Sequence, residues 1–239
     1  MDAALYTTLT RQSGLMSEME AVAHNIANAS TTGYRRQGVI FSEFVAALGN
    51  GDPSLSMALG NVRDTRLDQA PLAQTGGTFD LAIEGDGFFM VEGPEGPLLT
   101  RAGSFTPSET GELVTLDGLR LLDAGGAPVF VPPDARAVAV AADGTMSADG
   151  RPLTEIGLYL PADPTDLSHR DGVRFEAPGG ALPVIEGARI LQGFLEKSNV
   201  DPIAEVTRMI EIQRAYEQGQ TFLDREDERI RGVIRSLGR

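Results

Sequence analysis

Three carboxylates lie close together in a stretch with the period of a β-strand: Asp80, Glu84 and Asp86. Two carboxylates are the minimum set for glycoside hydrolysis, in which one donates a proton and the other attacks or activates water. Apolar residues alternate with small or acidic ones over Phe79–Ile83, which puts Ala82 and the acids together on the solvated face. The spacing therefore favours an exposed strand edge over a catalytic pair.

Other chemical motifs are incomplete. Gly85 and Gly87 are followed by Met90 at the position where a dinucleotide fingerprint requires a third glycine. The chain has no cysteine and two histidines, which argues against a zinc site and excludes a cysteine nucleophile. The sequence therefore predicts no catalytic, cofactor-binding or metal-binding residue, and a protein that is not an enzyme.

Composition narrows the class of protein further. The 239 residues are 41% hydrophobic and 23% charged, values typical of a folded chain that buries a core. The 34 acidic residues exceed the 20 basic ones, giving a formal net charge of −14, which does not favour nucleic-acid binding. No apolar run reaches the length of a transmembrane helix, and the first residues lack the pattern of a secretory signal peptide.

The N-terminal stretch predicts a helix with one packing face. Its apolar positions recur at alternating spacings of four and three, a heptad-like pattern that seeks another helix. This stripe consists of Leu5, Leu9, Gln12, Met16, Met19, Ala23 and Ile26, and is broadened by Leu15 and Val22. Short polar residues and Gly33 follow, so the helix should end near Asn28.

A second, longer helix is predicted at the C-terminal end. Asp201 can cap the free amides of its first turn, and Pro202 fits the first helical position. Polar residues interrupt its stripe once per heptad, which weakens burial but fixes register and partner. The stripe consists of Val206, Met209, Gln213, Tyr216, Gln220, Leu223, Asp227, Ile230, Ile234 and Leu237. The two helices are expected to pair with each other.

The middle of the chain predicts β structure. Residues 45–75 show no clear period and contain several glycines and prolines, which suggests a linker. Beyond them, Asp-Gly pairs recur between short strand-like runs, as in antiparallel sheets joined by tight turns. The expected fold is α+β, with a discontinuous N- and C-terminal coiled-coil layer enclosing an inserted antiparallel β domain. Its parts are a helix in 1–33, an extended segment in 34–75, the β domain in 76–194 and a helix in 195–239.

Three ordered motifs resemble those of the flagellar axial rod and hook proteins. Asn25–Arg35 resembles their N-terminal signature, and Leu195–Asp201 together with Met209–Glu217 resembles their C-terminal one. Leu81–Phe89 and Thr100–Phe105 resemble a segment shared by the longer rod proteins and the hook. The resemblance covers both ends and the first half of the β region, and no motif is matched from about 124 to 188.

The resemblance implies a structural subunit of the rod, the drive shaft that crosses the periplasm. The opening residues and the length favour the proximal rod over the distal rod protein FlgG, which is the alternative. The implied partners are the rod proteins FlgB, FlgC and FlgG and the flagellar export apparatus, which would export the chain without a cleaved signal peptide. The implied assembly interface comprises Leu5, Leu9, Met16, Met19, Ile26, Val206, Met209, Gln213, Tyr216, Leu223, Ile230, Ile234 and Leu237.

Two other classes of protein remain open from the residues alone. One is a soluble β-rich enzyme that uses Asp80, Glu84 and Asp86, which an inward position of two of these acids would support. The other is a monomeric binding module whose two helices pair only within the chain.

Overall fold

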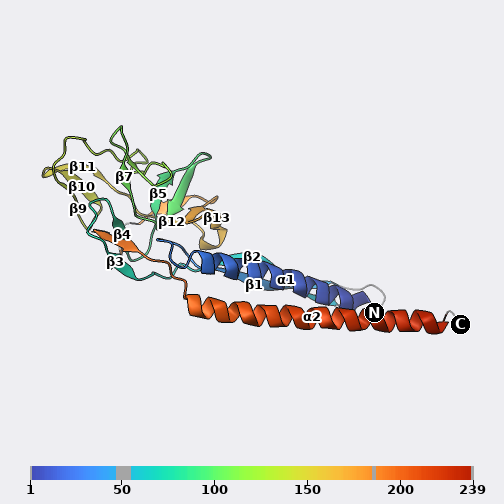
Figure 1. Cartoon of the computed structure of the whole chain (residues 1–239). Helices are drawn as coiled ribbons and strands as arrows, with labels where there is room; N and C mark the ends of the chain where they lie inside the picture. Colours follow the sequence, from blue (N-terminus) through green and yellow to red (C-terminus); the bar gives the residue numbers. More distant parts are fainter. Residues whose placement is uncertain (1, 47–54, 185–186, 238–239) are drawn as a thin grey trace. The chain divides into compact units, whose positions relative to one another are not determined.

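The chain forms two compact units. The computed structural model, shown in Figure 1, describes residues 2–46, 55–184 and 187–237. Unit 1 contains the described residues of Met1–Ala27, Gln37–Arg66 and Asp201–Arg239. Unit 2 contains those of Asn28–Arg36 and Leu67–Val200, so the chain passes between the units four times.

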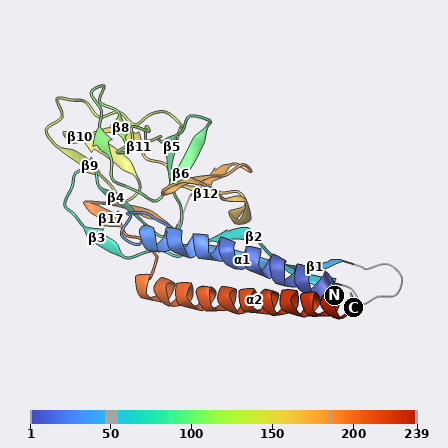
Figure 2. The ribbon, with the colours of Figure 1, turned by 45° about the vertical axis from the view of Figure 1, so that its right-hand side comes forward.

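Unit 1 is a pair of long helices with a β-hairpin. Helix α1 spans Asp2–Ala27 and helix α2 spans Pro202–Leu237, and they run side by side in Figures 1 and 2. The hairpin consists of the antiparallel strands β1, Gln37–Ala46, and β2, Leu55–Thr65. Both strands contact α1.

The helix boundaries follow from local hydrogen bonding. Asp201 Oδ1 accepts the backbone N–H groups of Ile203 at 2.9 Å and Ala204 at 3.3 Å, so it caps α2 as predicted. Pro202 is the first helical residue. At the other end of the chain, α1 stops at Ala27, within one residue of the predicted end at Asn28.

Unit 2 consists of short antiparallel strands. The largest sheet has four strands in the order β13-β14-β6-β5, and a three-stranded sheet has the order β11-β10-β9. Two-stranded pairs are β16-β4, β17-β3, β12-β15 and β7-β8. The bounds are β3 Leu72–Gln74, β4 Leu81–Glu84, β5 Phe89–Glu92, β6 Pro97–Thr100, β7 Thr106–Pro107, β8 Leu113–Val114, β9 Val138–Val140, β10 Thr145–Ala148, β11 Arg151–Glu155, β12 Tyr159–Pro161, the 3₁₀ turn η1 Pro164–Asp166, β13 Ser168–Asp171, β14 Arg174–Glu176, β15 Ala181–Pro183, β16 Arg189–Gln192 and β17 Phe194–Glu196.

An Asp-Gly turn sets the register of one hairpin, as the sequence predicts. Strands β10 and β11 pair antiparallel and are joined by Asp149 and Gly150. Both residues have positive φ, 50° and 79°. Asp and Gly tolerate this conformation better than most residues, so the turn fixes the hairpin locally.

Two hydrophobic clusters hold unit 2 together. The larger contains twelve buried residues, among them Phe89, Leu121 and Met146, each fully buried. Phe89 packs edge-on against Phe105, with ring centroids 5.6 Å apart. The smaller consists of Phe88, Leu99, Tyr159 and Phe175.

Two features differ from the sequence-based expectations. The segment 34–75, expected to be an extended linker, contains the β1–β2 hairpin and strand β3. Strand β4 does not expose one face, because Ala82 is as completely buried as Leu81 and Ile83. Side chains on both faces of β4 are therefore covered, which a two-residue period cannot reveal. Among the described residues, neither helix has a stretch long and apolar enough to cross a membrane.

Candidate assembly surface

The seam between α1 and α2 has a small apolar centre. Leu15, Val22 and Ile212 are buried there, with exposed fractions of 8%, 3% and 1%. Met19, Ile26, Met209, Ala215 and Tyr216 pack around them and remain partly exposed. Among the described side chains, three buried apolar residues along helices of 26 and 36 residues give little apolar burial for the length of the pair.

Polar contacts set the direction and register of the pair. Gln220 Nε2 donates to Gln12 Oε1 at 3.1 Å, and Arg208 Nε donates to Glu18 Oε1 at 2.7 Å. Higher numbers on α1 therefore meet lower numbers on α2, so the helices are antiparallel. The hydrogen bond with Glu18 raises the pKa of Arg208, which is consistent with a favourable ion pair.

Gly219 makes room for one of these contacts. A Cβ atom at this position would lie 2.8 Å from Nε2 of Gln12, closer than side chains normally approach. The same amide nitrogen lies 3.4 Å from the carbonyl oxygen of Tyr216, to which it donates. The glycine within α2 thus lets the buried Gln12 reach the backbone of the opposite helix.

A buried asparagine joins three of the four elements of unit 1: α1, β1 and α2. Asn25 Nδ2 donates to the Gln37 carbonyl at 2.8 Å, and Asn25 Oδ1 accepts the Gln37 N–H at 2.9 Å. Asn25 Nδ2 also lies 3.1 Å from Glu205 Oε2. Asn25 and Glu205 are 0% and 1% exposed, so this polar junction ties the end of α1 to the start of β1 and to the first turn of α2.

This junction was not predicted from the sequence, although the sequence contains a signal for it. Asn25 follows Val22 by three residues, and Glu205 precedes Ile212 by seven. Each polar residue therefore falls on the apolar stripe that the structure buries. Polar residues at such positions are typical of contacts that fix register.

The predicted interface residues occupy three kinds of position. Met19, Ile26, Met209 and Tyr216 pack around the buried seam, and Leu223 is half-buried. Leu9, Met16, Val206, Gln213, Ile230 and Ile234 are exposed. Leu5 and Leu237 lie on the helices, but their side chains are outside the described part of the structure.

The buried centre of the seam lies at the edge of the predicted stripe, at Leu15 and Val22, which broaden that stripe, while Met19 and Ile26 of the stripe pack around it. On α1 the structure buries Leu15 and Val22 and exposes Met16 and Ala23, and on α2 it buries Ile212 and exposes Gln213. One residue corresponds to about 100° around a helix. Both patterns have heptad spacing, and the partner helix decides between them.

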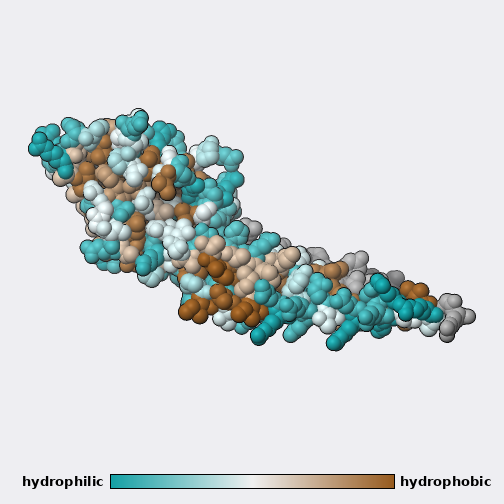
Figure 3. Space-filling view, in the orientation of Figure 1, coloured by the Kyte–Doolittle hydropathy of each residue, from teal (hydrophilic) through white to brown (hydrophobic). Residues whose placement is uncertain are grey.

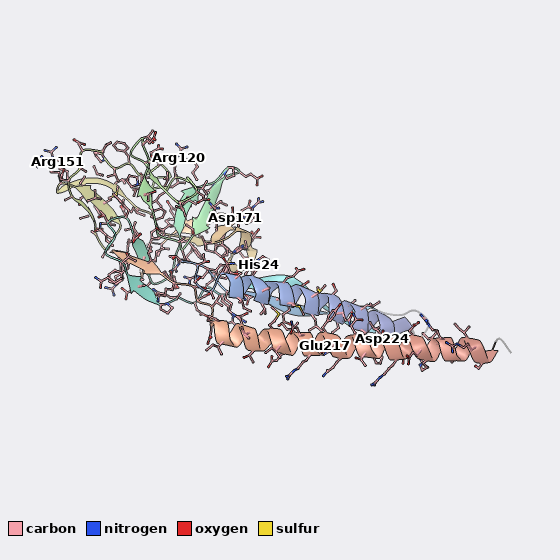
Figure 4. The ribbon with its side chains drawn as sticks, in the orientation of Figure 1. His24, Arg120, Arg151, Asp171, Glu217 and Asp224 are labelled. Carbon is pink, nitrogen blue, oxygen red and sulfur yellow. The ribbon has the colours of Figure 1, made fainter. Side chains whose placement is uncertain are left out.

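Exposed apolar residues form two sets on α2. Ile203, Val206 and Ile210 share a face at the start of the helix, and hydrophobic atoms gather over its first turns in Figure 3. Ile230 and Ile234 lie seven and eleven residues after Leu223, so they continue the seam face toward the C-terminus. Between the two sets, the charged residues Glu217 and Asp224, labelled in Figure 4, are exposed on α2 together with the aromatic Phe222.

A groove also runs along the helix pair. It has a volume of about 440 Å³ and is lined by residues of both helices, including Leu15, Ala215 and Phe222. Phe222 is 42% exposed, which leaves an aromatic ring at the groove wall. The surface of unit 1 therefore presents apolar groups on more than one side.

The candidate catalytic acids do not converge. Asp80 Oδ2 accepts the Thr75 hydroxyl at 2.6 Å, and Glu84 forms an exposed ion pair with Arg189 at 2.7 Å. Asp86 is exposed. Two buried acids would have supported an enzyme. None of the three is buried. In the described part of the chain, no group of three or more His, Cys, Asp or Glu residues could hold a metal.

Family comparisons match the chain in three places. Residues 5–35 match a family described as flagella basal body rod protein. Residues 82–148 match the flagellar hook protein FlgE/F/G D1 domain, and residues 191–235 match the C-terminal region of flagellar basal body rod FlgEFG proteins. The central match extends past residue 124, where the sequence motifs could no longer be followed.

Full-length relatives decide the family. The flagellar basal-body rod protein FlgF of Caulobacter vibrioides is 38% identical over 245 residues, covering 100% of this chain and 99% of the relative. The FlgF protein of Mesorhizobium japonicum is 36% identical over 241 residues, with the same coverage. The chain belongs to the FlgF family of flagellar basal-body rod proteins.

The alternative within the rod proteins is less similar. The flagellar basal-body rod protein FlgG of Bacillus subtilis is 28% identical over 257 residues, covering 97% of each chain. This identity is lower than that to the FlgF relatives over a comparable length, which confirms the resemblance deduced from the sequence motifs. Membership of the FlgF family also agrees with the expectation that the chain is not an enzyme.

Proposed function

We propose that the chain is a structural subunit of the proximal rod, the part of the periplasmic drive shaft nearest the cell interior. The family supports a rod subunit, and the observation that carries the assembly role is the apolar surface of unit 1. Five residues of α2, Ile203, Val206, Ile210, Ile230 and Ile234, are each more than a third exposed, and among the described side chains the apolar residues buried in the seam are Leu15, Val22 and Ile212. A helix pair with this distribution gains burial when further helices cover it.

The proposed assembly uses unit 1 as a coiled-coil inner layer and the β domain, residues 76–194, as the outer part. The exposed predicted residues, including Leu9, Met16 and Val206, would contact helices of neighbouring subunits. Contacts between different surface patches generate a helical filament when the rotation from one subunit to the next does not close into a ring. The net charge of −14 would keep unassembled subunits apart.

The proposed partners are the other axial proteins, FlgB, FlgC and FlgG, together with the flagellar export apparatus. Export through that apparatus would deliver the chain to the periplasmic rod without a cleaved signal peptide. The alternative within this role is a distal position like that of FlgG. A monomeric binding module is the alternative outside it, and the contacts Gln12–Gln220 and Glu18–Arg208 within one chain are the observations in its favour.

A matched pair of triple variants tests the proposal. Ile203→Ser, Val206→Ser and Ile210→Ser together remove the exposed apolar face at the start of α2. The control carries Leu116→Ser, Leu153→Ser and Leu182→Ser, three exposed apolar residues of unit 2. Each apolar side chain buried on assembly contributes about 1.5–3 kcal/mol, so the α2 variant should be strongly depleted from purified basal bodies.

Immunoblots of basal bodies and motility in soft agar provide the measurements. We expect the control variant to assemble and swim like the unmodified protein. Normal assembly of the α2 variant would contradict the proposed role of this face. Equal depletion of both variants would show that the effect does not belong to unit 1.

A further inference from the structure

Three segments distant in sequence meet within unit 2. Residues 33–36, 68–72 and 196–199 exchange hydrogen bonds, and strand β17 pairs with β3 at the same place. All of these residues belong to unit 2. The segments lie next to the positions where the chain passes between the two units, so their contacts bear on how the chain leaves unit 2.

Glu196 connects the three segments from a fully buried position. Its Oε1 accepts Nη2 of Arg35 at 2.8 Å and the backbone N–H of Ala70 at 2.8 Å. Its Oε2 accepts Nη1 of Arg101 at 3.1 Å, and its carbonyl accepts the N–H of Gly33 at 2.8 Å. The side chains of Arg35 and Glu196 are 0% exposed, and that of Arg101 is 3% exposed.

Asn199 makes a second set of connections three residues later. Its Oδ1 accepts the N–H of Arg36 at 2.6 Å, and its Nδ2 donates to the Asp68 carbonyl at 3.1 Å. Its own N–H lies 3.3 Å from the Tyr34 carbonyl. The side chain of Asn199, in residues 196–199, therefore links residues 33–36 to residues 68–72.

These contacts coincide with the passages between units. The chain passes from one unit to the other after Ala27, Arg36, Arg66 and Val200. Arg36 is the last residue before the second passage, Asp68 is the second residue after the third, and Asn199 is the second to last before the fourth. The bonds of Asn199 thus fasten three of the four passages to one another.

The backbone of residues 33–36 lies directly against another segment of unit 2. Gly33 has φ of 73°, a conformation that disfavours other residues. A Cβ atom at Gly33 would lie 2.3 Å from the backbone nitrogen of Ala102. The backbone of residues 33–36 is therefore held against the segment that carries Arg101.

A purely apolar contact could hold these segments together but would not give the same directional bonds. A buried ion pair is often no more stabilising than a well-packed apolar group of the same size, and its best-attested advantage is that it fixes one arrangement. Burial lowers the pKa of Arg101, and the neighbouring Glu196 acts in the opposite direction. Removing Glu196 would leave two buried cations without their carboxylate, which is strongly unfavourable.

We propose that the side chains of Glu196 and Asn199 form a latch that shares mechanical load among the chain passages between the two units. Without these side chains, a force on one passage would be shared only through backbone bonds, such as those from Gly33 to Glu196 and from Lys197 to Pro71. With the latch closed, force on residues 33–36 is passed to 68–72 and 196–199 through hydrogen bonds loaded together. The functional value of the latch rests on the proposed role in a rotating shaft, but its mechanical behaviour can be measured on the isolated protein.

Single-molecule pulling on the full chain tests the latch. The chain has no cysteine, so Ala27→Cys and Ile203→Cys, both at exposed positions, provide unique handles. Pulling between them loads the bonds from residues 33–36 to 196–199 in parallel with the Asn25–Glu205 junction, which is the same in every variant compared. We expect Asn199→Ala to shorten the lifetime of the first rupture at constant force by about tenfold, the equivalent of one to two hydrogen bonds.

Lys197→Ala is the matched control. Lys197 lies between the two latch residues and is exposed, and its backbone N–H bond to the Pro71 carbonyl, at 3.0 Å, does not depend on its side chain. The control should rupture like the unmodified chain. A lifetime for Asn199→Ala that cannot be distinguished from that of Lys197→Ala would overturn the proposal.

Glu196→Gln provides a second variant, for which we expect a larger loss of lifetime than for Asn199→Ala. Circular dichroism establishes first whether this variant folds, and if it does not, Asn199→Ala decides the question. Failure of the latch leaves the rod assignment intact, since pulling involves no rod. Failure of rod assembly in the α2 triple variant would leave the measured latch unchanged.

Discussion

The described side chains of the two units differ in how much apolar surface they bury. Among the described residues, unit 2 has one cluster of twelve buried hydrophobic residues and a second of four. The α1–α2 seam has three. Short strands joined by tight turns thus enclose a core in unit 2, whereas the long helices leave Val206, Ile210 and Ile234 exposed.

The difference indicates two sources of stability. A chain segment must offset about 1–2 kcal/mol of backbone entropy for each ordered residue, and apolar burial is the main term that does so. In unit 2, apolar side chains are buried against other residues of the same unit. The described side chains of unit 1 leave apolar groups at surfaces that other helices can cover, as expected of an assembling part of a rod subunit.

The largest effect should come from emptying the core of unit 2. Phe89→Ala removes a fully buried ring that packs against Phe105, and we expect it to reduce the free energy of unfolding of unit 2 by about 3–5 kcal/mol. Urea denaturation followed by circular dichroism in the β region measures this. The control Leu9→Ala, at a residue 46% exposed in unit 1, should change the same transition by less than about 0.5 kcal/mol. Similar losses for both variants would mean that the two units are not energetically distinct.

Much of this division could be predicted from the sequence. The end of α1 near Asn28, the cap at Asp201 and the Asp149–Gly150 turn depend on a few neighbouring residues, and each is present in the structure. The alternation of helices and β structure follows from the change of period along the chain. These features are local, which is why one sequence is enough to predict them.

The rest depends on contacts between distant segments. The hairpin β1–β2 was not predicted, because residues 45–75 have no clear period and their pairing is decided by tertiary packing. The heptad pattern permitted either Met16 or Leu15 at the seam, and packing of the two helices selects Leu15. The junction of Asn25 with Glu205 joins residues 180 apart, so only the fold brings it together.

Hydrogen exchange on the purified monomer sharpens the comparison. If unit 1 depends on neighbours, amides across Ala204–Ile234 should exchange at least about a hundredfold faster than those of Leu81–Ile83 in unit 2. Sedimentation establishes that the sample is monomeric. Strong protection across α2 in a verified monomer would contradict this expectation and favour a self-contained binding module.

A smaller effect concerns acid stability in unit 2. Burial pushes the pKa of Asp123 upward, but hydrogen bonds from Ala127 and Gly125 N–H and from the Thr154 hydroxyl outweigh it, so its pKa lies below the ordinary value of 3.8. A depressed folded-state pKa adds stability above 3.8 that is lost as the pH falls through the folded value. Because the site is close to solvent, we expect less than about 1 kcal/mol.

Asp123→Asn tests this linkage. The difference in unfolding free energy between the unmodified chain and this variant should be largest near neutral pH and shrink below about pH 4. Asp134→Asn, which removes an exposed negative charge from the same unit, controls for the change in net charge. A difference that stays constant from pH 7 to pH 2 would show that the hydrogen bonds of Asp123 do not favour its ionised form.

The smallest effect on the monomer, and the sharpest separation of folding from assembly, is expected at Gln213. This residue lies on the predicted stripe, yet it is exposed and next to the buried Ile212. Gln213→Leu should therefore change the stability of the isolated chain by less than about 0.5 kcal/mol.

In the rod, Gln213 would be enclosed by a neighbouring subunit. A leucine there gains burial but no longer discriminates against wrong partners. We expect normal thermal unfolding of the monomer together with fewer correct rods and more aggregates in basal-body preparations. Gln218→Leu, another exposed glutamine of α2, is the matched control, and normal rod yield from Gln213→Leu would show that this side chain does not select neighbours.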